Sequence, residues 1–186
     1  ATKYLAGHND VLGGLVVCRE AEVAEILAER QILEGSVLSP DDAWLILRGM
    51  KTLALRMRQH EHNALRLARW LSEHPLIERV YYPGLADHPG HRVLAEQARG
   101  FGGMLSFTVK KIFLIDQLLS NLRIVAFAES LGGVETLITY PAMQTHRDIP
   151  PERRRQVGIT DTLVRVSVGI EDVDDLIEDF AQALGG

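Results

Sequence analysis

Residues 1–14 read Ala-Thr-Lys-Tyr-Leu-Ala-Gly-His-Asn-Asp-Val-Leu-Gly-Gly, and an apolar run, Leu-Val-Val-Cys, follows at residues 15–18. Lys3 is the side chain of interest, because a lysine ammonium loses its charge readily when it is desolvated. A neutral amine can then condense with an aldehyde. Most lysines are solvated at the protein surface, so the residue type alone favours an ordinary surface role. Both interpretations stay open at this point.

The composition is that of an ordinary globular protein. Of 186 residues, 46% are hydrophobic and 24% charged, which argues against disorder. The formal net charge of −5 excludes general attraction to nucleic acid or anionic membrane. No apolar run approaches the roughly 18 residues of a membrane span. Cys18 is the only cysteine, so an internal disulfide is excluded and a reducing, cytoplasmic location is expected. Cys18 itself is expected to be a small buried hydrophobe.

The first third of the chain predicts one strand and two helices. The β-branched run at 15–18 predicts a buried strand, and the spacing over 20–33 predicts a helix that ends at Gly35. Ser39-Pro40 is typical of a helix start, with Ser39 as the N-cap. Apolar residues then recur at helical spacing as far as residue 71, which predicts one long helix with Gly49 as its weakest point.

The remainder of the chain alternates between strands and helices. Strands are expected at 77–82, 104–109, 124–127, 137–140 and 163–168, and helices at 91–99, 115–122, 150–157 and after Asp172. This alternation predicts a small sheet faced by helices, of the α/β class. The arginine run at 153–155 is expected to be the solvated face of its helix.

Arg165 lies on the strand expected at 163–168. The neighbouring valines of this strand alternate with it, so Arg165 and Ser167 share the opposite face. A buried guanidinium without a partner costs several kcal/mol. Either this face is wet or an anion pairs with Arg165, and the planar fork suits a carboxylate. The alternative is an ion pair with a nearby acidic residue.

The histidines give no clear metal site. His60 and His62 are two residues apart on a predicted helix and therefore do not face each other. His88 and His91 lie in a predicted loop, on either side of Pro89-Gly90. Zinc sites usually show repeated Cys and His spacings. The sequence therefore predicts no metal.

The motif Ala-Thr-Lys-Tyr-Leu-x-Gly-His-x-Asp-Val at residues 1–11 resembles the cofactor-lysine motif of the pyridoxal-phosphate trans-sulfuration enzymes, the cystathionine γ-synthase, γ-lyase and β-lyase family. Further family blocks resemble residues 38–53, 100–107, 128–137, 141–146 and 163–172. The resemblance implies the C-terminal part of a fold-type I, aspartate-aminotransferase-like α/β fold. It assigns residues 1–38 to the end of the cofactor domain, 39–74 to a long linking helix and 75–186 to a C-terminal α/β domain.

The resemblance also implies roles for individual residues. Lys3 binds pyridoxal 5′-phosphate covalently and removes the substrate's α-proton, and Thr2 bonds the cofactor phosphate. On the substrate side, Arg165 holds the α-carboxylate with the backbone at Ser130 and Leu131. Two further residues line the substrate pocket, Glu129 and Thr145.

The implied reaction is β-elimination of cystathionine to homocysteine, pyruvate and ammonia. Three stretches together are most similar to a bacterial branch of cystathionine β-lyases: Ile-Thr-Tyr-Pro-Ala-Met-Gln-Thr-His at 138–146, Asp-Ile-Pro at 148–150 and Gly-His-Asn-Asp-Val-Leu at 7–12. A γ-lyase, a γ-synthase and a non-catalytic interaction fragment remain alternatives. Family members are much longer, with the cofactor lysine in mid-chain. The resemblance implies three kinds of partner: the missing N-terminal half, an amino-acid substrate and further copies in a tetramer, a dimer of dimers. The 186-residue chain alone is expected to be inactive.

Overall fold

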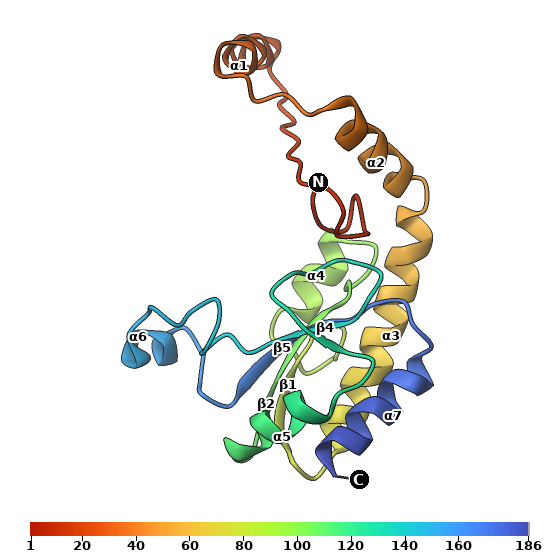
Figure 1. Cartoon of the computed structure of the whole chain (residues 1–186), viewed down its shortest axis with the longest axis vertical. Coiled ribbons are helices and arrows are strands. Elements are labelled where there is room, and N and C mark those ends of the chain that lie inside the picture. The colour runs from red at the N-terminus through yellow and green to blue at the C-terminus, as the bar shows by residue number, and fades with distance from the viewer. Residues whose placement is uncertain (186) are drawn as a thin grey trace. The chain divides into compact units, whose positions relative to one another are not determined.

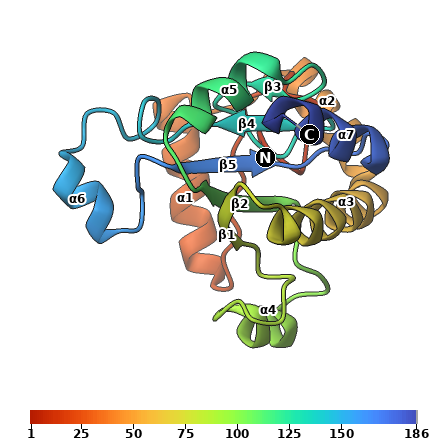
Figure 2. The same ribbon diagram turned by 90° about the horizontal axis from the view of Figure 1, so that it is seen from below.

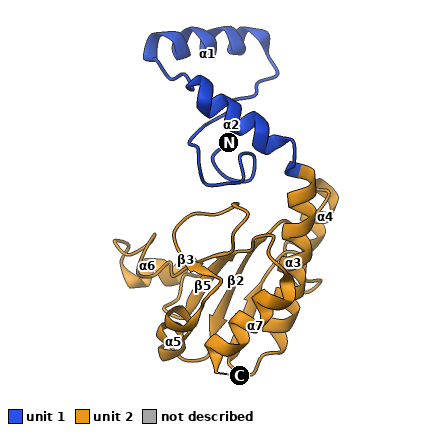
Figure 3. Cartoon of the chain, turned by 45° about the vertical axis from the view of Figure 1, so that its right-hand side comes forward, with its two compact units in different colours: residues 1–53 blue, residues 54–186 orange. Residues whose placement is uncertain are grey.

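The computed structural model describes residues 1–185, and the chain divides into two compact units. Unit 1 comprises residues 1–53 and unit 2 begins at Ala54 (Figure 3). Each unit has its own core of buried apolar side chains, a small one in unit 1 and a large one in unit 2. The two units are therefore described separately.

Unit 1 contains two helices, α1 (Ala21–Glu34) and α2 (Pro40–Met50). Their ends follow the sequence signals. Gly35 ends α1 in the left-handed conformation at φ 70°, which glycine adopts without strain. The Ser39 hydroxyl caps α2 by accepting the Asp42 N–H at 3.0 Å, and Pro40 occupies the first turn. The caps predicted from the sequence are confirmed.

A small core fixes the first turn of the chain against α2. Ala6, Val11 and Ile46 are buried together. Gly49 of α2 lies so close to Ala6 that a Cβ at this position would overlap the Ala6 carbonyl. The glycine expected to be the weak point of the helix therefore permits the close approach that holds the segment carrying Lys3.

Two predicted elements of this region differ from the structure. Residues 15–18 form no strand, and Cys18 is partly exposed rather than buried. A strand requires a hydrogen-bonding neighbour, and the described residues of unit 1 contain none. The long helix expected from Ser39 onward is divided into α2 and α3 (Leu53–Glu73) by a turn at Lys51 and Thr52.

Unit 2 is built on a five-stranded sheet in the order β1-β2-β5-β4-β3 (Figure 2). The strands are β1 (Ile77–Tyr81), β2 (Met104–Val109), β3 (Ala126–Phe127), β4 (Leu137–Thr139) and β5 (Leu163–Ser167). All neighbours pair antiparallel except β3 and β4, which are parallel. The mixed α/β fold expected from the sequence is confirmed.

Helices α3, α5 (Phe113–Asn121) and α7 (Val173–Leu184) share one core with the sheet. Helices α3 and α7 lie side by side (Figure 1). The core includes Leu67 of α3, Leu118 of α5 and Phe180 of α7, all fully buried. Two short helices, α4 (His91–Gln97) and α6 (Pro151–Gln156), complete the unit.

The register of the sheet separates an apolar face from a polar face. Val166 of β5 pairs with Leu105 of β2 and Ile138 of β4, and all three are in the core. One residue back along β5, Arg165 pairs with Ser106 and Thr139. Because successive side chains of a strand point to opposite faces, Arg165 lies on the face away from the core. The alternation predicted for this strand is confirmed.

Asp179 of α7 joins this helix to the segment that leads into β3. Its carboxylate accepts the backbone N–H groups of Arg123, Ile124 and Val125 at 2.9, 2.9 and 3.0 Å. Burial by itself raises the pKa of Asp179, but these bonds and one from the Gln182 side chain outweigh it, so the pKa is lowered. A lowered pKa means that the folded state stabilises the charged form.

We expect the Asp179 carboxylate to stabilise the fold above its ordinary pKa of 3.8, with the contribution lost as the pH falls through the lower folded value. Asp179→Asn should lower the free energy of unfolding at pH 7 by about 2 kcal/mol, because bonds to a charged group are lost. It should also flatten the dependence of stability on pH below about pH 4. Urea unfolding followed by Trp70 fluorescence, with Trp44 changed to Phe, tests this. An unchanged pH profile would contradict it.

Candidate active site

The Arg165 guanidinium is held by hydrogen bonds to two segments of unit 2. One terminal nitrogen (Nη2) donates to the Thr139 hydroxyl at 3.0 Å and to the Ser130 carbonyl at 3.4 Å. Thr139 belongs to β4, and Ser130 lies in the loop between β3 and β4. The side chain is partly buried on the polar face of the sheet. Its position is thus defined by β5, by the neighbouring strand and by the loop.

No carboxylate within the described part of the chain lies within ion-pair distance, 4.0 Å, of Arg165. The ion pair with a nearby acid, which the sequence left open, is therefore not found there. Burial lowers the pKa of Arg165, while the more distant charge of Glu129 raises it. The Arg165 Nε–H is buried and has no hydrogen-bond partner in residues 1–185. This environment suits an external anion that can accept from the guanidinium.

The loop between β3 and β4 is held by hydrogen bonds to the side chains of Ser167 and Glu171, which follow Arg165 in the sequence. The Gly132 N–H donates to the Ser167 hydroxyl at 2.8 Å, and this contact is buried. Glu171 accepts both the N–H and the hydroxyl of Thr136, whose hydroxyl also accepts from Gly169. These bonds fix the backbone around Ser130 relative to β5.

The other substrate-side residues named from the sequence lie in two loops of unit 2. Glu129 is exposed, while Ser130 and Leu131 are partly buried beside Arg165 on the loop that the guanidinium contacts. Thr145 is exposed on the loop after β4, where its hydroxyl lies 2.7 Å from the His146 ring. Arg165 and the Ser130 segment are thus brought together, whereas no contact joins Thr145 to Arg165 in the described residues.

The first turn of unit 1 presents Lys3. The Gly7 N–H donates to the Lys3 carbonyl at 2.8 Å, and the Ala6 N–H donates to the Ala1 carbonyl at 3.0 Å. The Lys3 side chain itself is exposed in this chain. The Thr2 hydroxyl accepts the Gly13 N–H at 3.0 Å and lies 3.3 Å from the Gly13 carbonyl. The phosphate role of Thr2 stays a prediction.

These residues fit pyridoxal phosphate in their chemistry. An exposed amine on a turn fixed by backbone hydrogen bonds and by the small core of unit 1 is accessible to an aldehyde. The Thr2 hydroxyl could serve a phosphate oxygen only by giving up its contact with the Gly13 carbonyl, since a hydroxyl has one proton to donate. The anion-poor surroundings of Arg165 fit the carboxylate of an amino acid.

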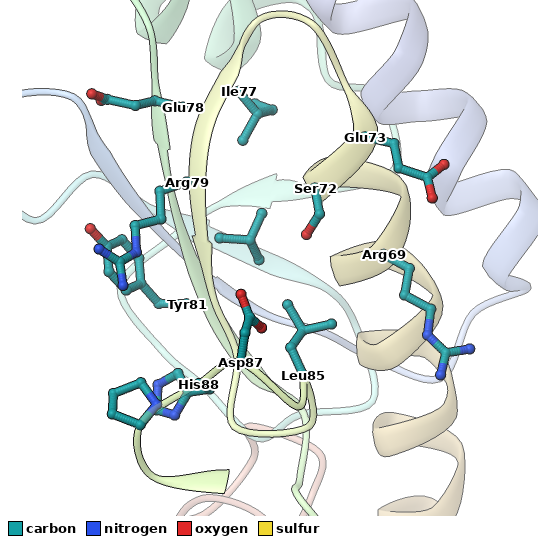
Figure 4. A pocket seen from close by; sticks show the side chains of 12 residues that line it. Arg69, Ser72, Glu73, Ile77, Glu78, Arg79, Tyr81, Leu85, Asp87 and His88 are labelled. Carbon is teal, nitrogen blue, oxygen red and sulfur yellow. The ribbon is translucent and has the colours of Figure 1, made fainter.

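A separate cavity of about 380 Å³ lies beside β1, one of the two edge strands of the sheet (Figure 4). Acidic and basic side chains line it together, and Arg79 stacks over the Tyr81 ring at 5.0 Å. None of the site residues named from the sequence lines this cavity.

Within residues 1–185, no cluster of three or more His, Cys, Asp or Glu side chains could hold a metal, and no helix could cross a membrane.

Sequence reasoning missed several of the residues that shape the site. Thr139 and Ser167 each contact a site element through a hydroxyl. The Thr139 contact depends on the register that pairs this residue with Arg165, and the Ser167 contact depends on the fold of the loop at Gly132. Arg154 was expected on a solvated helix face, and the structure corrects this. It is 8% exposed, pairs with Asp161 at 3.0 Å and donates to the Ala142 carbonyl. The helix α6 is short and packs this one arginine inward against the loop that carries Thr145.

Comparison with known proteins gives a consistent result. The family model for Cys/Met metabolism PLP-dependent enzymes matches residues 1–185. The cystathionine γ-lyase of Bacillus subtilis is 52% identical, and a cystathionine β-lyase of Lactococcus lactis is 47% identical. Each match covers 99% of this chain and 48% of the relative.

The solved structures agree. The cystathionine γ-synthase of Xanthomonas oryzae superposes with a TM-score of 0.94 at 45% identity, over 98% of this chain and 48% of that one. The chain spans about half the length of the relatives it matches. It belongs to the Cys/Met metabolism family of PLP-dependent enzymes.

Proposed function

We propose that this chain forms the second half of a carbon–sulfur lyase that uses pyridoxal phosphate and cleaves cystathionine by β-elimination. The observation that carries the proposal is Arg165, a partly buried guanidinium with no carboxylate within 4.0 Å in the described residues. It lies on the polar face of the sheet beside the anchored loop at Ser130. An amino-acid substrate would supply the carboxylate that pairs with Arg165. The reaction class is inferred from the family, whose members depend on pyridoxal phosphate.

Each part of the site has a defined role in this proposal. Arg165 and the backbone at Ser130 and Leu131 bind the α-carboxylate and so orient the substrate. The Lys3 amine holds the cofactor and takes the α-proton at its Nζ atom. When bound, pyridoxal phosphate supplies an electron sink for the negative charge left on the α-carbon. Glu129 and Thr145 lie on loops of unit 2 that would border the leaving group.

The surface of unit 1 supports an association with the remaining half of the family fold. No residue of α1 is buried, and Val16 and Val17 are 76% and 94% exposed. An apolar groove is lined by residues 14–16, by Cys18 and by residues of α1 that include Leu27. Exposed apolar surface of this extent is typical of an interface. We therefore propose that the first half of the enzyme covers it, in an assembly that includes further copies of the chain as a tetramer.

The direction of elimination distinguishes the main proposal from its alternative. The relatives include cystathionine β-lyases, γ-lyases and a γ-synthase at similar identity. The motif at 138–146 supports β-elimination by its resemblance to bacterial β-lyases. A γ-elimination on the same site would require the proton relay to extend to the β-carbon.

Product analysis of the complete enzyme tests the proposal. By complete enzyme we mean the polypeptide of family length in which these 186 residues are the second half. Incubation with cystathionine should yield pyruvate and homocysteine, which mass spectrometry identifies. Formation of 2-oxobutyrate and cysteine instead would contradict β-elimination and show γ-elimination. The 186-residue chain alone is the control and should give neither product, and turnover by it would contradict the need for the other half.

A further inference from the structure

Thr139 occupies the position on β4 that pairs directly with Arg165 of β5. The residue is 1% exposed, so its hydroxyl must find its hydrogen bonds inside the protein. A β-branched residue at a strand end needs no functional explanation. Its hydroxyl contacts nevertheless connect the two parts of the proposed carboxylate site.

The direction of these contacts is fixed by the chemistry of the groups. A guanidinium can only donate, so the Thr139 hydroxyl accepts from Arg165 at 3.0 Å. The single hydroxyl proton is then donated to the Ala128 carbonyl at 2.9 Å. Ala128 lies two residues before Ser130, whose carbonyl Arg165 also contacts. Thr139 therefore links the guanidinium to the start of the loop.

One consequence concerns which N–H groups of Arg165 remain for a ligand. The contacts with Thr139 and Ser130 both use Nη2, whereas the buried Nε–H has no partner in the described residues. Because two hydrogen bonds hold Nη2, the guanidinium is restrained in rotation about the Cδ–Nε bond. Its unused N–H groups are then preorganised, so less conformational entropy is lost when a carboxylate binds.

We propose that Thr139 is a positioning residue, which orients the Arg165 guanidinium for the substrate's carboxylate through its hydroxyl. The inference rests on the proposed function, in which Arg165 binds that carboxylate. Thr139 itself touches neither substrate nor cofactor. Its effect should therefore appear in the binding of ligands that carry a carboxylate, and hardly in the binding of ligands that lack one.

The test uses Thr139→Val, which keeps the shape and removes the hydroxyl, in the complete enzyme. A hydrogen bond to a charged group contributes enough that its loss should raise the KM for cystathionine roughly tenfold, with a smaller change in kcat. The inhibition constant of L-alanine should rise by a similar factor, while that of ethylamine, which has no carboxylate, should stay the same. Thr139→Ser keeps the hydroxyl and should behave like the unchanged enzyme.

Two controls separate the possible failures. Thr108→Val alters a buried threonine of β2 that pairs with Leu163 rather than Arg165, and it should leave the KM unchanged. Arg165→Ala tests the underlying function. If it raises the KM and Thr139→Val does not, the positioning role is wrong and the carboxylate site stands. If neither raises the KM, the proposed function of Arg165 fails. Equal weakening of L-alanine and ethylamine by Thr139→Val would also overturn the positioning role.

Discussion

Replacement of Lys3 by alanine in the complete enzyme is expected to abolish both covalent attachment of the cofactor and turnover. The amine has two tasks in the proposed function, bonding to the aldehyde and taking the α-proton. Loss of the proton transfer alone typically costs about 10³-fold in rate, and no other amine is expected to replace it. The steady-state rate of pyruvate formation measures the loss of activity.

A chemical readout locates the attachment independently of activity. Borohydride reduction of the complete enzyme, followed by peptide mass spectrometry, should place a pyridoxyl phosphate adduct on the peptide that contains Lys3. Lys51 provides a matched control, because it is an exposed lysine of the same unit at the end of α2. Lys51→Ala should retain the adduct and the activity. An adduct on Lys51, Lys110 or Lys111 instead would refute the assignment of Lys3.

The elements of unit 2 could be predicted from the sequence because their signals are local. The alternation of valines in β5 and the Asp172 cap of α7 depend on neighbouring residues alone. The Asp172 side chain accepts the Asp174 N–H at 2.9 Å, as its position before an apolar periodic segment indicates. Such patterns survive because tertiary packing here reinforces the local preference.

Residues 15–18 show where local reasoning fails. The run Leu-Val-Val-Cys has the composition of a buried strand, yet strand formation needs a partner edge that the described residues of unit 1 lack. These residues therefore prefer the strand conformation, but the described residues of unit 1 offer no neighbouring strand to pair with. The prediction for Arg154 was wrong for a different reason, because its partners lie on other segments of the chain. A partner distant in space, the carbonyl of Ala142, could not be inferred from the spacing of α6.

The candidate site combines both situations. That Arg165 lies on the polar face of its strand followed from alternation, but the absence of a carboxylate partner in the described residues did not. The sequence offered many acids for an ion pair, and only the folded arrangement shows that Glu129 acts on Arg165 at a distance beyond an ion pair. The register of β4 with β5, which places Thr139 opposite Arg165, was likewise not visible in either strand alone.

Substitution of Arg165 should reduce catalytic efficiency strongly. Removal of one member of a desolvated charge pair typically costs about 2–5 kcal/mol of binding, so kcat/KM for cystathionine should fall by at least about 30-fold in Arg165→Ala. Arg165→Lys should recover only part of this loss, because an ammonium cannot form the paired bonds of a planar fork. Steady-state kinetics of the three enzymes, at substrate concentrations well above and below KM, separates the effect on binding from the effect on the chemical step.

The same arginine should affect stability in the reverse direction. Without substrate, Arg165 is a desolvated charge that lacks a carboxylate partner in the described residues, so Arg165→Met should leave the free energy of unfolding unchanged or raise it. Arg154→Met is the matched comparison, because that guanidinium is paired with Asp161 and donates to Ala142. Its loss should cost about 2 kcal/mol. Urea unfolding of the substrate-free enzyme decides the matter. A large loss of stability in Arg165→Met would mean that the guanidinium stabilises the fold and would contradict its assignment as an anion-binding group.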